Sequence, residues 1–115
     1  MTRTGEPRVV RTIEGTPTRG DFRVETLVDG THMTLLEIEL DAGTASALHA
    51  HDHESILYVV RGRLRSEAGG TSVELGPGDT CVHEAGVPHL VEALEASVFV
   101  EVKSPAQKMD AIFRD

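Results

Sequence analysis

The sequence predicts an all-β fold, in which short antiparallel strands form a sandwich or a barrel. Apolar and polar residues alternate with a period of two in many segments, as in strands that bury one face. Glycine-rich breaks separate these segments, and each segment is too short to be a core helix. Roughly ten such segments follow one another with nothing long between them. A closed or two-sheet arrangement is expected, because it hides strand edges that would otherwise aggregate.

The expected strands can be placed in chain order from these breaks. The Asp29-Gly30 pair predicts a tight two-residue hairpin turn after the first of them. The C-terminal stretch QKMDAIFRD, residues 107–115, predicts a short helix. The strands are expected over residues 21–28, 32–40, 55–60, 63–68, 71–75, a segment ending at residue 83, 89–93 and 96–103.

Length and composition limit the classes of function. A chain of 115 residues predicts one domain over residues 1–115. Its formal charge is −8, and Lys and Arg form no stripe that could bind nucleic acid. No segment reaches the roughly 20 apolar residues of a membrane span, so we expect no membrane association and a cytoplasmic protein. The single cysteine, Cys81, excludes an intramolecular disulfide and is expected to be a small buried side chain.

Three of the six histidines stand on alternating positions in HAHDHES, residues 49–55. Residues two apart on a strand share a face, so His49 and His51 can direct both imidazoles at one metal ion. Two ligands do not make a tight site, and His89, which opens a strand after the turn EAGVP, is the expected third. By the same alternation His53 shares their face.

Two segments resemble the motifs of the cupins. GTASALHAHDHESILYVVRG, residues 43–62, follows the pattern G-x5-H-x-H-x3-E-x6-G, and GDTCVHEAGVPH, residues 78–89, follows G-x5-P-x-G-x2-H. The resemblance implies a single cupin β-barrel, or jelly roll, with a divalent metal inside. It implies His49, His51 and His89 as metal ligands, and a homodimer. The metal could be Zn, Fe, Mn, Ni or Cu, since imidazole suits several of these ions.

The sequence departs from the motifs at two positions. Ser55 stands where the family has a glutamate ligand, and Glu84 replaces the proline of the second motif. Without a carboxylate the bare site keeps a charge of about +2 and leaves open positions for water or substrate. Ser55, inward by alternation, could hydrogen-bond a water there. Two alternatives complete the ligand shell: Glu54 after a register shift, although it is expected outward, or His53, which we rank as a residue of the surrounding shell or pocket rim.

The overall layout is similar to small cupins that ketonise unsaturated uronates from pectin breakdown, and to cupins that cyclise polyketides. Those proteins carry glutamine at the position of Ser55, and the uronate group ends in a pattern like D-x-F-S-P-P-R, where this chain has EVKSPAQ, residues 101–107. Lys103 could hold a substrate carboxylate as a point charge. Glu101, opposite the valines of its strand, is the candidate proton shuttle. The resemblance implies non-redox isomerisation or ketonisation, cyclisation or lyase chemistry on an oxygenated carbonyl or enol substrate.

Two other functions are compatible with the same three histidines. One is an Fe(II)-dependent dioxygenase, which would consume O₂. The other is a non-catalytic cupin that binds a metabolite or a metal. Among the remaining residues, His83 could lie near the pocket mouth but is rather expected to be partly exposed on the barrel rim, and His32 is expected on the surface. The run ILYVV with Tyr58 is expected in the core or at a subunit interface.

Overall fold

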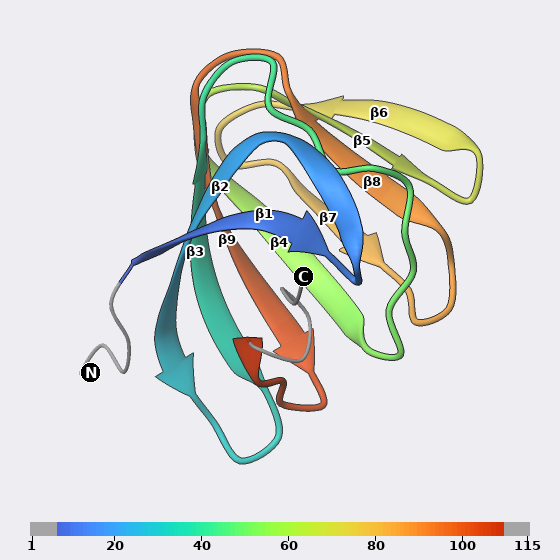
Figure 1. Cartoon of the computed structure of the whole chain (residues 1–115). Coiled ribbons are helices and arrows are strands. Elements are labelled where there is room, and N and C mark those ends of the chain that lie inside the picture. The colour runs from blue at the N-terminus through green and yellow to red at the C-terminus, as the bar shows by residue number, and fades with distance from the viewer. Residues whose placement is uncertain (1–6, 110–115) are drawn as a thin grey trace.

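The computed structural model describes residues 7–109, and this part of the chain contains nine strands in two antiparallel sheets (Figure 1). The larger sheet has the order β1-β2-β3-β9-β4-β7, and the smaller has the order β6-β5-β8. This is the all-β jelly roll that the sequence predicts. The strands are β1 Arg8–Ile13, β2 Thr16–Asp29, β3 Thr34–Leu40, β4 Glu54–Arg61, β5 Leu64–Ala68, β6 Thr71–Leu75, β7 Thr80–His83, β8 His89–Ala93 and β9 Ser97–Ser104.

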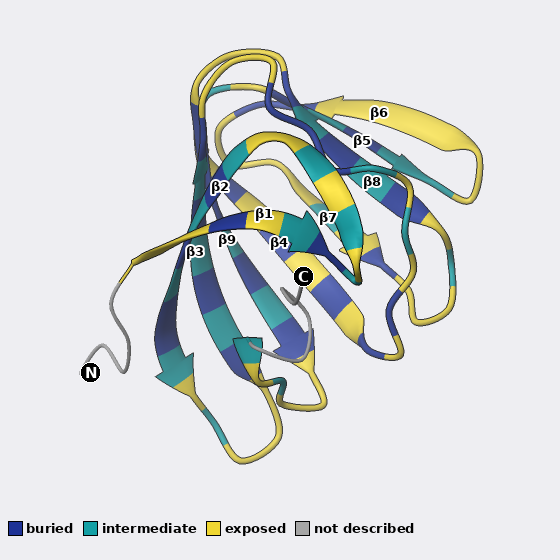
Figure 2. Cartoon of the chain, viewed as in Figure 1, coloured by how far each residue is buried: buried dark blue, intermediate teal, exposed yellow. Residues whose placement is uncertain are grey.

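The core lies between the inner faces of the two sheets. Buried and more exposed residues alternate along β3 and β4, as the banding in Figure 2 shows. Each fully buried Leu or Ile side chain contributes roughly 1.5–3 kcal/mol through the apolar surface that it removes from water. The buried apolar cluster consists of Val10, Ile13, Phe22, Val24, Leu36, Ile38, Leu40, Leu57, Val59, Leu64, Leu75, Val91, Ala93 and Phe99.

The first hairpin is a feature that the sequence prediction missed. Strands β1 and β2 pair up to Ile13 and Thr16, so only Glu14 and Gly15 form the turn. Both have positive φ, 52° and 77°, as a type I′ turn requires. The segment that follows the turn, with Pro17 and Gly20, belongs to the long strand β2, which therefore begins before the strand expected at residues 21–28. The hairpin places a carboxylate, Glu14, at one end of the barrel.

The predicted two-residue turn at Asp29-Gly30 is wrong. Asp29 still pairs with Thr34 across β2 and β3, so the connection consists of residues 30–33. The amide of Gly30 donates to the carbonyl of Met33 at 2.7 Å and closes this longer loop. Because Asp29 is the last paired residue of β2, the chain turns one residue later than the Asp29-Gly30 dipeptide suggests.

The chain beyond β9 lies only partly within the described residues. The predicted helix over residues 107–115 falls mostly outside them. Gln107 is fixed to β3, because its amide donates to Thr34 Oγ1 at 2.9 Å and its carbonyl accepts from the same hydroxyl at 3.1 Å. Between residues 7 and 109, no helix has the length and apolar character needed to cross a bilayer.

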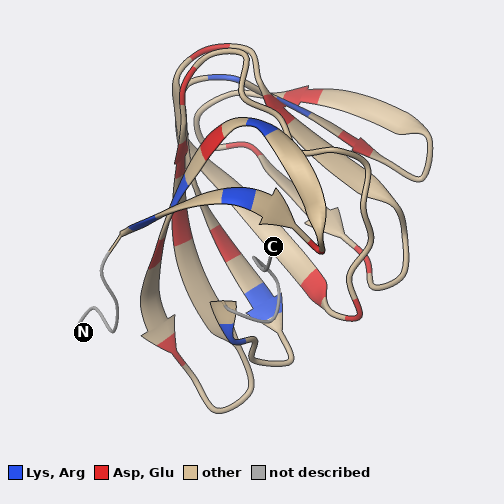
Figure 3. Ribbon diagram, viewed as in Figure 1, with Lys and Arg blue, Asp and Glu red and all other residues tan. Residues whose placement is uncertain are grey.

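The positions of basic and acidic residues are interspersed along the ribbon (Figure 3), and the sequence holds 11 basic and 19 acidic residues. Several form ion pairs between strands. Glu92 on β8 accepts from both Arg19 and Arg65, at 2.8 and 2.9 Å, and Glu39 on β3 accepts from Arg23 at 2.8 Å. These pairs are partly or fully exposed, so each is worth little, about 0–1 kcal/mol.

Candidate metal centre

The three histidines predicted as ligands come together at the start of β8. His49 lies in the connection between β3 and β4 and forms a two-hydrogen-bond bridge with His89, with N to O distances of 3.0 and 2.8 Å. The carbonyl of His51 accepts from the amide of Gly86 at 2.8 Å. The alternation at His49 and His51 was argued from strand geometry, but β4 begins only at Glu54 and these two residues precede it. The extended connection nevertheless keeps the two-residue alternation, because this bridge holds it beside β8.

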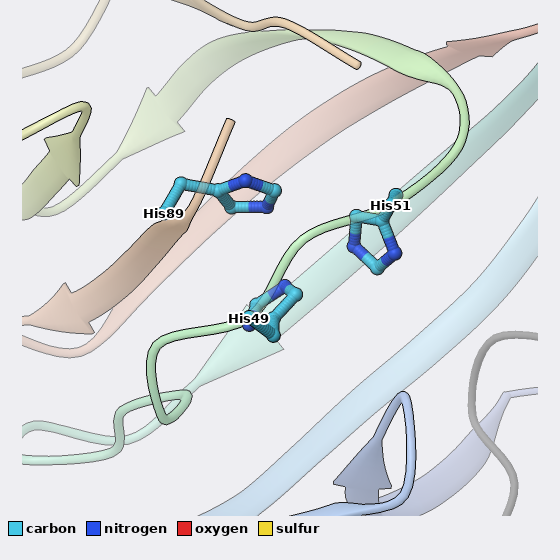
Figure 4. Close-up of side chains that lie close together, drawn as sticks. All are labelled: His49, His51 and His89. Atoms are coloured by element: carbon cyan, nitrogen blue, oxygen red, sulfur yellow. The ribbon is translucent and has the colours of Figure 1, made fainter. Parts of the chain in front are cut away.

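One ring nitrogen from each of His49, His51 and His89 lies within 4.8 Å of the other two. The ring centroid of His49 lies 4.7 Å from that of His51 and 4.4 Å from that of His89. Figure 4 shows the three rings around one shared space. His51 and His89 are buried and His49 is half-buried. Three imidazoles grouped in this way could hold a transition-metal ion.

Hydrogen bonds orient two of these rings for metal binding. His49 Nδ1 lies 2.7 Å from the carbonyl of Ala47, and His89 Nδ1 lies 3.1 Å from the carbonyl of Val87. A carbonyl can only accept, so both Nδ1 atoms carry the proton and both Nε2 atoms keep a free lone pair. This is the tautomer that binds a metal through Nε2.

The three imidazoles are neutral near pH 7. Burial lowers the pKa of His49 and also that of His89, which falls to about 4. The pKa of His51 is lowered as well, first by burial and then by the positive charge of Lys103. A metal ion requires deprotonated imidazole, so no proton has to leave these rings before an ion binds at neutral pH.

Next to the three ligand candidates lies a buried chain of charged and aromatic groups. The ring of His53 stacks on that of His51, with centroids 4.4 Å apart and planes 19° apart. His53 Nε2 accepts from Lys103 Nζ at 3.1 Å, and that ammonium lies 3.4 Å from Glu101 Oε2. His53, Glu101 and Lys103 are all buried. Strand β9 therefore brings both a carboxylate and an ammonium into the barrel interior.

Glu101 is a carboxylate in this setting. Its burial raises the pKa, but the charge of Lys103, the neighbouring His83 and the Ser55 hydroxyl act against it, and the net pKa is lowered. Ser55 is buried between His83 on β7 and Lys103 on β9, with which it pairs across the sheet. Its Oγ lies near Glu101 yet has no partner with regular hydrogen-bond geometry. Glu101 therefore faces the pocket as a proton acceptor, beside the Lys103 ammonium.

His83 does not lie on the rim, and its predicted partial exposure is wrong. It is 1% exposed, its ring stacks on His89 with centroids 4.1 Å apart, and its Nε2 lies 2.8 Å from Ser66 Oγ. The pairing of His83 with the inward Ser55 puts its side chain on the inner face. In the sequence, only the alternation within the four-residue strand TCVH could have indicated the burial of His83. Alternation separates the two faces of a strand but does not show which face points into the barrel.

The remaining predicted positions lie outside the group of three imidazoles. Glu54 is exposed, as alternation predicts, and so it does not join the three imidazoles. His32 is exposed in the loop between β2 and β3. Cys81 is half-buried beside Ser66 and His83, and burial raises the pKa of its thiol.

A small pocket opens beside the histidines. Its cavity volume is about 30 Å³, and a water molecule needs roughly 10–15 Å³ on this measure. The closed part therefore has room for an ion with a water or two, and a substrate has to occupy the open mouth. The pocket is lined by Ile13, Phe22, Ile38, Ser46, His49, His51, His83, His89, Val91, Phe99, Glu101 and Lys103.

The antiparallel jelly roll and the three imidazoles inside its barrel place this chain among the small β-barrel proteins with a candidate metal site in the interior. A family model described as "Cupin domain" matches residues 36–102, more than half of the chain. The chain therefore belongs to the cupin family. A search of curated proteins found no significant match.

Solved structures with the same fold support this assignment. KdgF from a Halomonas species is 27% identical, with a TM-score of 0.72 over 75% of this chain and 82% of that one. An RmlC-like cupin from Shewanella frigidimarina is 20% identical, with a TM-score of 0.75 over 94% and 97% of the two chains. A predicted oxalate decarboxylase from Thermotoga maritima is 20% identical, with a TM-score of 0.79 over 91% and 99%. The last two similarities concern the fold alone.

Proposed function

We propose that this cupin is a metal-dependent enzyme that performs non-redox chemistry on a small oxygenated carbonyl or enol substrate. Isomerisation or ketonisation, cyclisation and lyase reactions belong to this class. One observation carries the proposal: the ionised Glu101 and the Lys103 ammonium lie in the same pocket as three neutral imidazoles. Such a pocket combines a base, a cation and a set of metal ligands. A base that removes the proton and positive charges that stabilise the developing oxyanion both favour proton transfer next to a carbonyl.

Each group has a distinct part in this proposal. A divalent ion held by His49, His51 and His89 would act as a Lewis acid towards a substrate oxygen. Glu101 accepts a proton from the carbon next to that oxygen and returns it to another position. Lys103 keeps the buried carboxylate ionised before the reaction and favours an anionic substrate. Glu101 starts as the base, since its pKa is lowered.

A second candidate, an Fe(II)-dependent dioxygenase, is favoured by the ligand set itself. The three candidate ligands are all neutral nitrogens, and Ser55 stands where the family motif has a carboxylate. Such a set leaves several positions on the ion open for a substrate and O₂. A non-catalytic metal- or metabolite-binding role would use the histidines, and Lys103 for an anionic metabolite, but gives no part to Glu101 as a base.

Metal analysis combined with an O₂-uptake assay tests these functions together. The purified protein is expected to bind about one divalent ion per chain, and His49→Ala or His89→Ala to remove it. His32→Ala, which changes an exposed histidine, is the matched control. Full metal content in both pocket variants would reject the metal site. O₂ consumption with bound iron would favour the dioxygenase over the non-redox enzyme.

A carbonyl or enol substrate turned over without O₂ would identify the non-redox class. In that assay Glu101→Gln is expected to abolish turnover while metal content is kept. An unchanged rate would exclude Glu101 as the base.

We also propose a homodimer that pairs through the outer face of β4, β7 and β9. Ile56, Tyr58 and Val60 on β4 are 46–49% exposed, and Val82 on β7 is 45% exposed. Ile56 pairs with Val82 on one side and with Val102 on the other, so the apolar surface is continuous across three strands. A contiguous exposed apolar surface is typical of a protein interface. A second copy would cover this surface and leave the pocket on the inner side free.

A further inference from the structure

The ring of His51 differs from those of His49 and His89 in its outer nitrogen. The Nδ1 atoms of the other two rings each donate to a backbone carbonyl. His51 Nδ1 is buried and has no hydrogen-bond partner. A buried ring nitrogen without a partner leaves the tautomer unassigned, so nothing seen so far directs the Nε2 lone pair of His51 at an ion.

A carboxylate from the first hairpin, Glu14, lies close to this nitrogen. Glu14 Oε2 lies 3.6 Å from His51 Nδ1, slightly beyond hydrogen-bond distance. The Glu14 side chain is 26% exposed, and it belongs to the turn between β1 and β2. Ile13, the residue before it, lines the pocket, so the turn is held against the site by the core.

The turn between β1 and β2 accounts for the positive φ of Glu14 but not for the presence of a glutamate at this position. Within residues 7–109 Glu14 is the one non-glycine residue with positive φ, 52°. Type I′ turns prefer Asn, Asp or Gly at this position, because those residues tolerate the left-handed conformation best. A glutamate here is unfavourable for the turn. Its longer side chain, however, reaches His51, which a side chain as short as Asn or Asp would do less well.

We propose that Glu14 is a positioning residue of the metal site, which accepts the Nδ1–H of His51 and thereby directs the Nε2 lone pair of that ring at the ion. The 3.6 Å separation exceeds the 3.5 Å limit of a hydrogen bond by only about 0.1 Å, so the proposed contact needs the two atoms to approach slightly. The resulting carboxylate–histidine–metal arrangement fixes the tautomer and raises the basicity of the ligand. It also brings one negative charge near a site whose motif lacks its carboxylate at Ser55. This inference rests on the proposed metal site.

The test measures zinc affinity and the His51 tautomer in the full-length protein after chelator treatment and reloading with zinc alone. Glu14→Asn removes the reach of the carboxylate while it improves the turn, and Glu14→Gln keeps a neutral acceptor of the same length. Asp52→Asn, which removes an exposed charge between His51 and His53, is the matched control. We expect Glu14→Asn to weaken zinc binding about 10–100-fold, Glu14→Gln to weaken it less, and Asp52→Asn to leave it within about twofold. Metal-free Glu14→Asn should melt no lower than the wild type.

Nitrogen NMR of the imidazole rings provides a readout that a purely structural role would not change. His51 is expected to carry its proton on Nδ1 in the wild type and in Glu14→Gln, and to lose this preference in Glu14→Asn. Equal zinc affinity in wild type and Glu14→Asn, or a proton on Nε2 of His51, would overturn the inference. So would a cobalt absorption spectrum that shows Glu14 bound to the ion directly. A wild type that binds no zinc would instead reject the proposed function.

Discussion

Lys103 Nζ lies 3.4 Å from Glu101 Oε2 inside the barrel, and the two side chains come from the same face of β9. The contact joins two buried charges, and its partners are close to the candidate metal ligands. Removal of one partner is expected to be costly, because the other remains as an unpaired buried charge. We expect Lys103→Met to lower the free energy of unfolding by about 3–5 kcal/mol. Urea denaturation of the metal-free protein measures this change.

The matched control for that prediction is the double variant Glu101→Gln with Lys103→Met. It removes both charges, so it is expected to be less destabilised than the sum of the two single variants, by about 0.5–3 kcal/mol. Additive effects would show that the two charges do not interact. His53 loses its donor in both the single and the double variant, so its contribution cancels in this comparison.

The metal-free protein is expected to lose stability as the pH falls from 7 to 5. Burial lowers the pKa of both His53 and His89 to about 4, while the unfolded value is about 6.5. Between these values the unfolded chain binds more protons than the folded chain, so stability rises with pH, by up to about 1.4 kcal/mol per pH unit for each histidine. Urea denaturation at a series of pH values measures the slope. A free energy of unfolding that is constant over this range would contradict neutral buried histidines.

His53 can be separated from the other histidines in this experiment. His53→Asn should reduce the slope of the free energy of unfolding against pH by the contribution of about one bound proton, since the remaining rings keep their own contributions. His32→Ala, at an exposed position, should leave the slope unchanged. Glu101, whose pKa is lowered, affects stability only at lower pH, where carboxylates take up protons.

Ser55 offers a test of what the serine at the glutamate position does. Its Oγ is buried without a hydrogen-bond partner of regular geometry, and a buried unsatisfied hydroxyl is unfavourable. We therefore expect Ser55→Ala to keep or raise stability, by up to about 1 kcal/mol. Thermal unfolding measures this. A loss of more than about 1 kcal/mol would show that the hydroxyl makes a stabilising hydrogen bond to Glu101 or to a bound water. Ser66→Ala is the comparison, because that hydroxyl lies 2.8 Å from His83 and its loss should be destabilising.

The proposed dimer can be tested on its apolar surface. Tyr58→Asp places a charge at the middle of the β4 surface and is expected to give monomers, because a buried unpaired charge disfavours association. Val73→Asp, at a similarly exposed apolar position on β6, should leave the oligomeric state unchanged. Light scattering after size-exclusion chromatography measures the mass. A dimeric Tyr58→Asp variant would place the interface elsewhere.

Much of the fold followed from local pattern. Strands β6 and β8 begin and end where the alternation predicted, because turn residues bound them on both sides. Strand β1 was missed, and the connection between β2 and β3 is longer than its dipeptide suggested. Both differences have the same cause: pairing with a neighbouring strand decides where a strand ends, and that pairing is absent from the local sequence.

The sequence by itself determined which side chains of residues 49–59 point inward, since alternation continues from the histidine-rich connection into β4 and buries His51, His53, Ser55, Leu57 and Val59 in turn. The two motifs also indicated His89. Only the tertiary structure decided what surrounds these residues. Register across β4 puts His83 and Lys103 on either side of Ser55, and the first hairpin brings Glu14 to His51. Contacts between distant segments depend on strand order and register, which are set by packing of the whole barrel and not by any one segment.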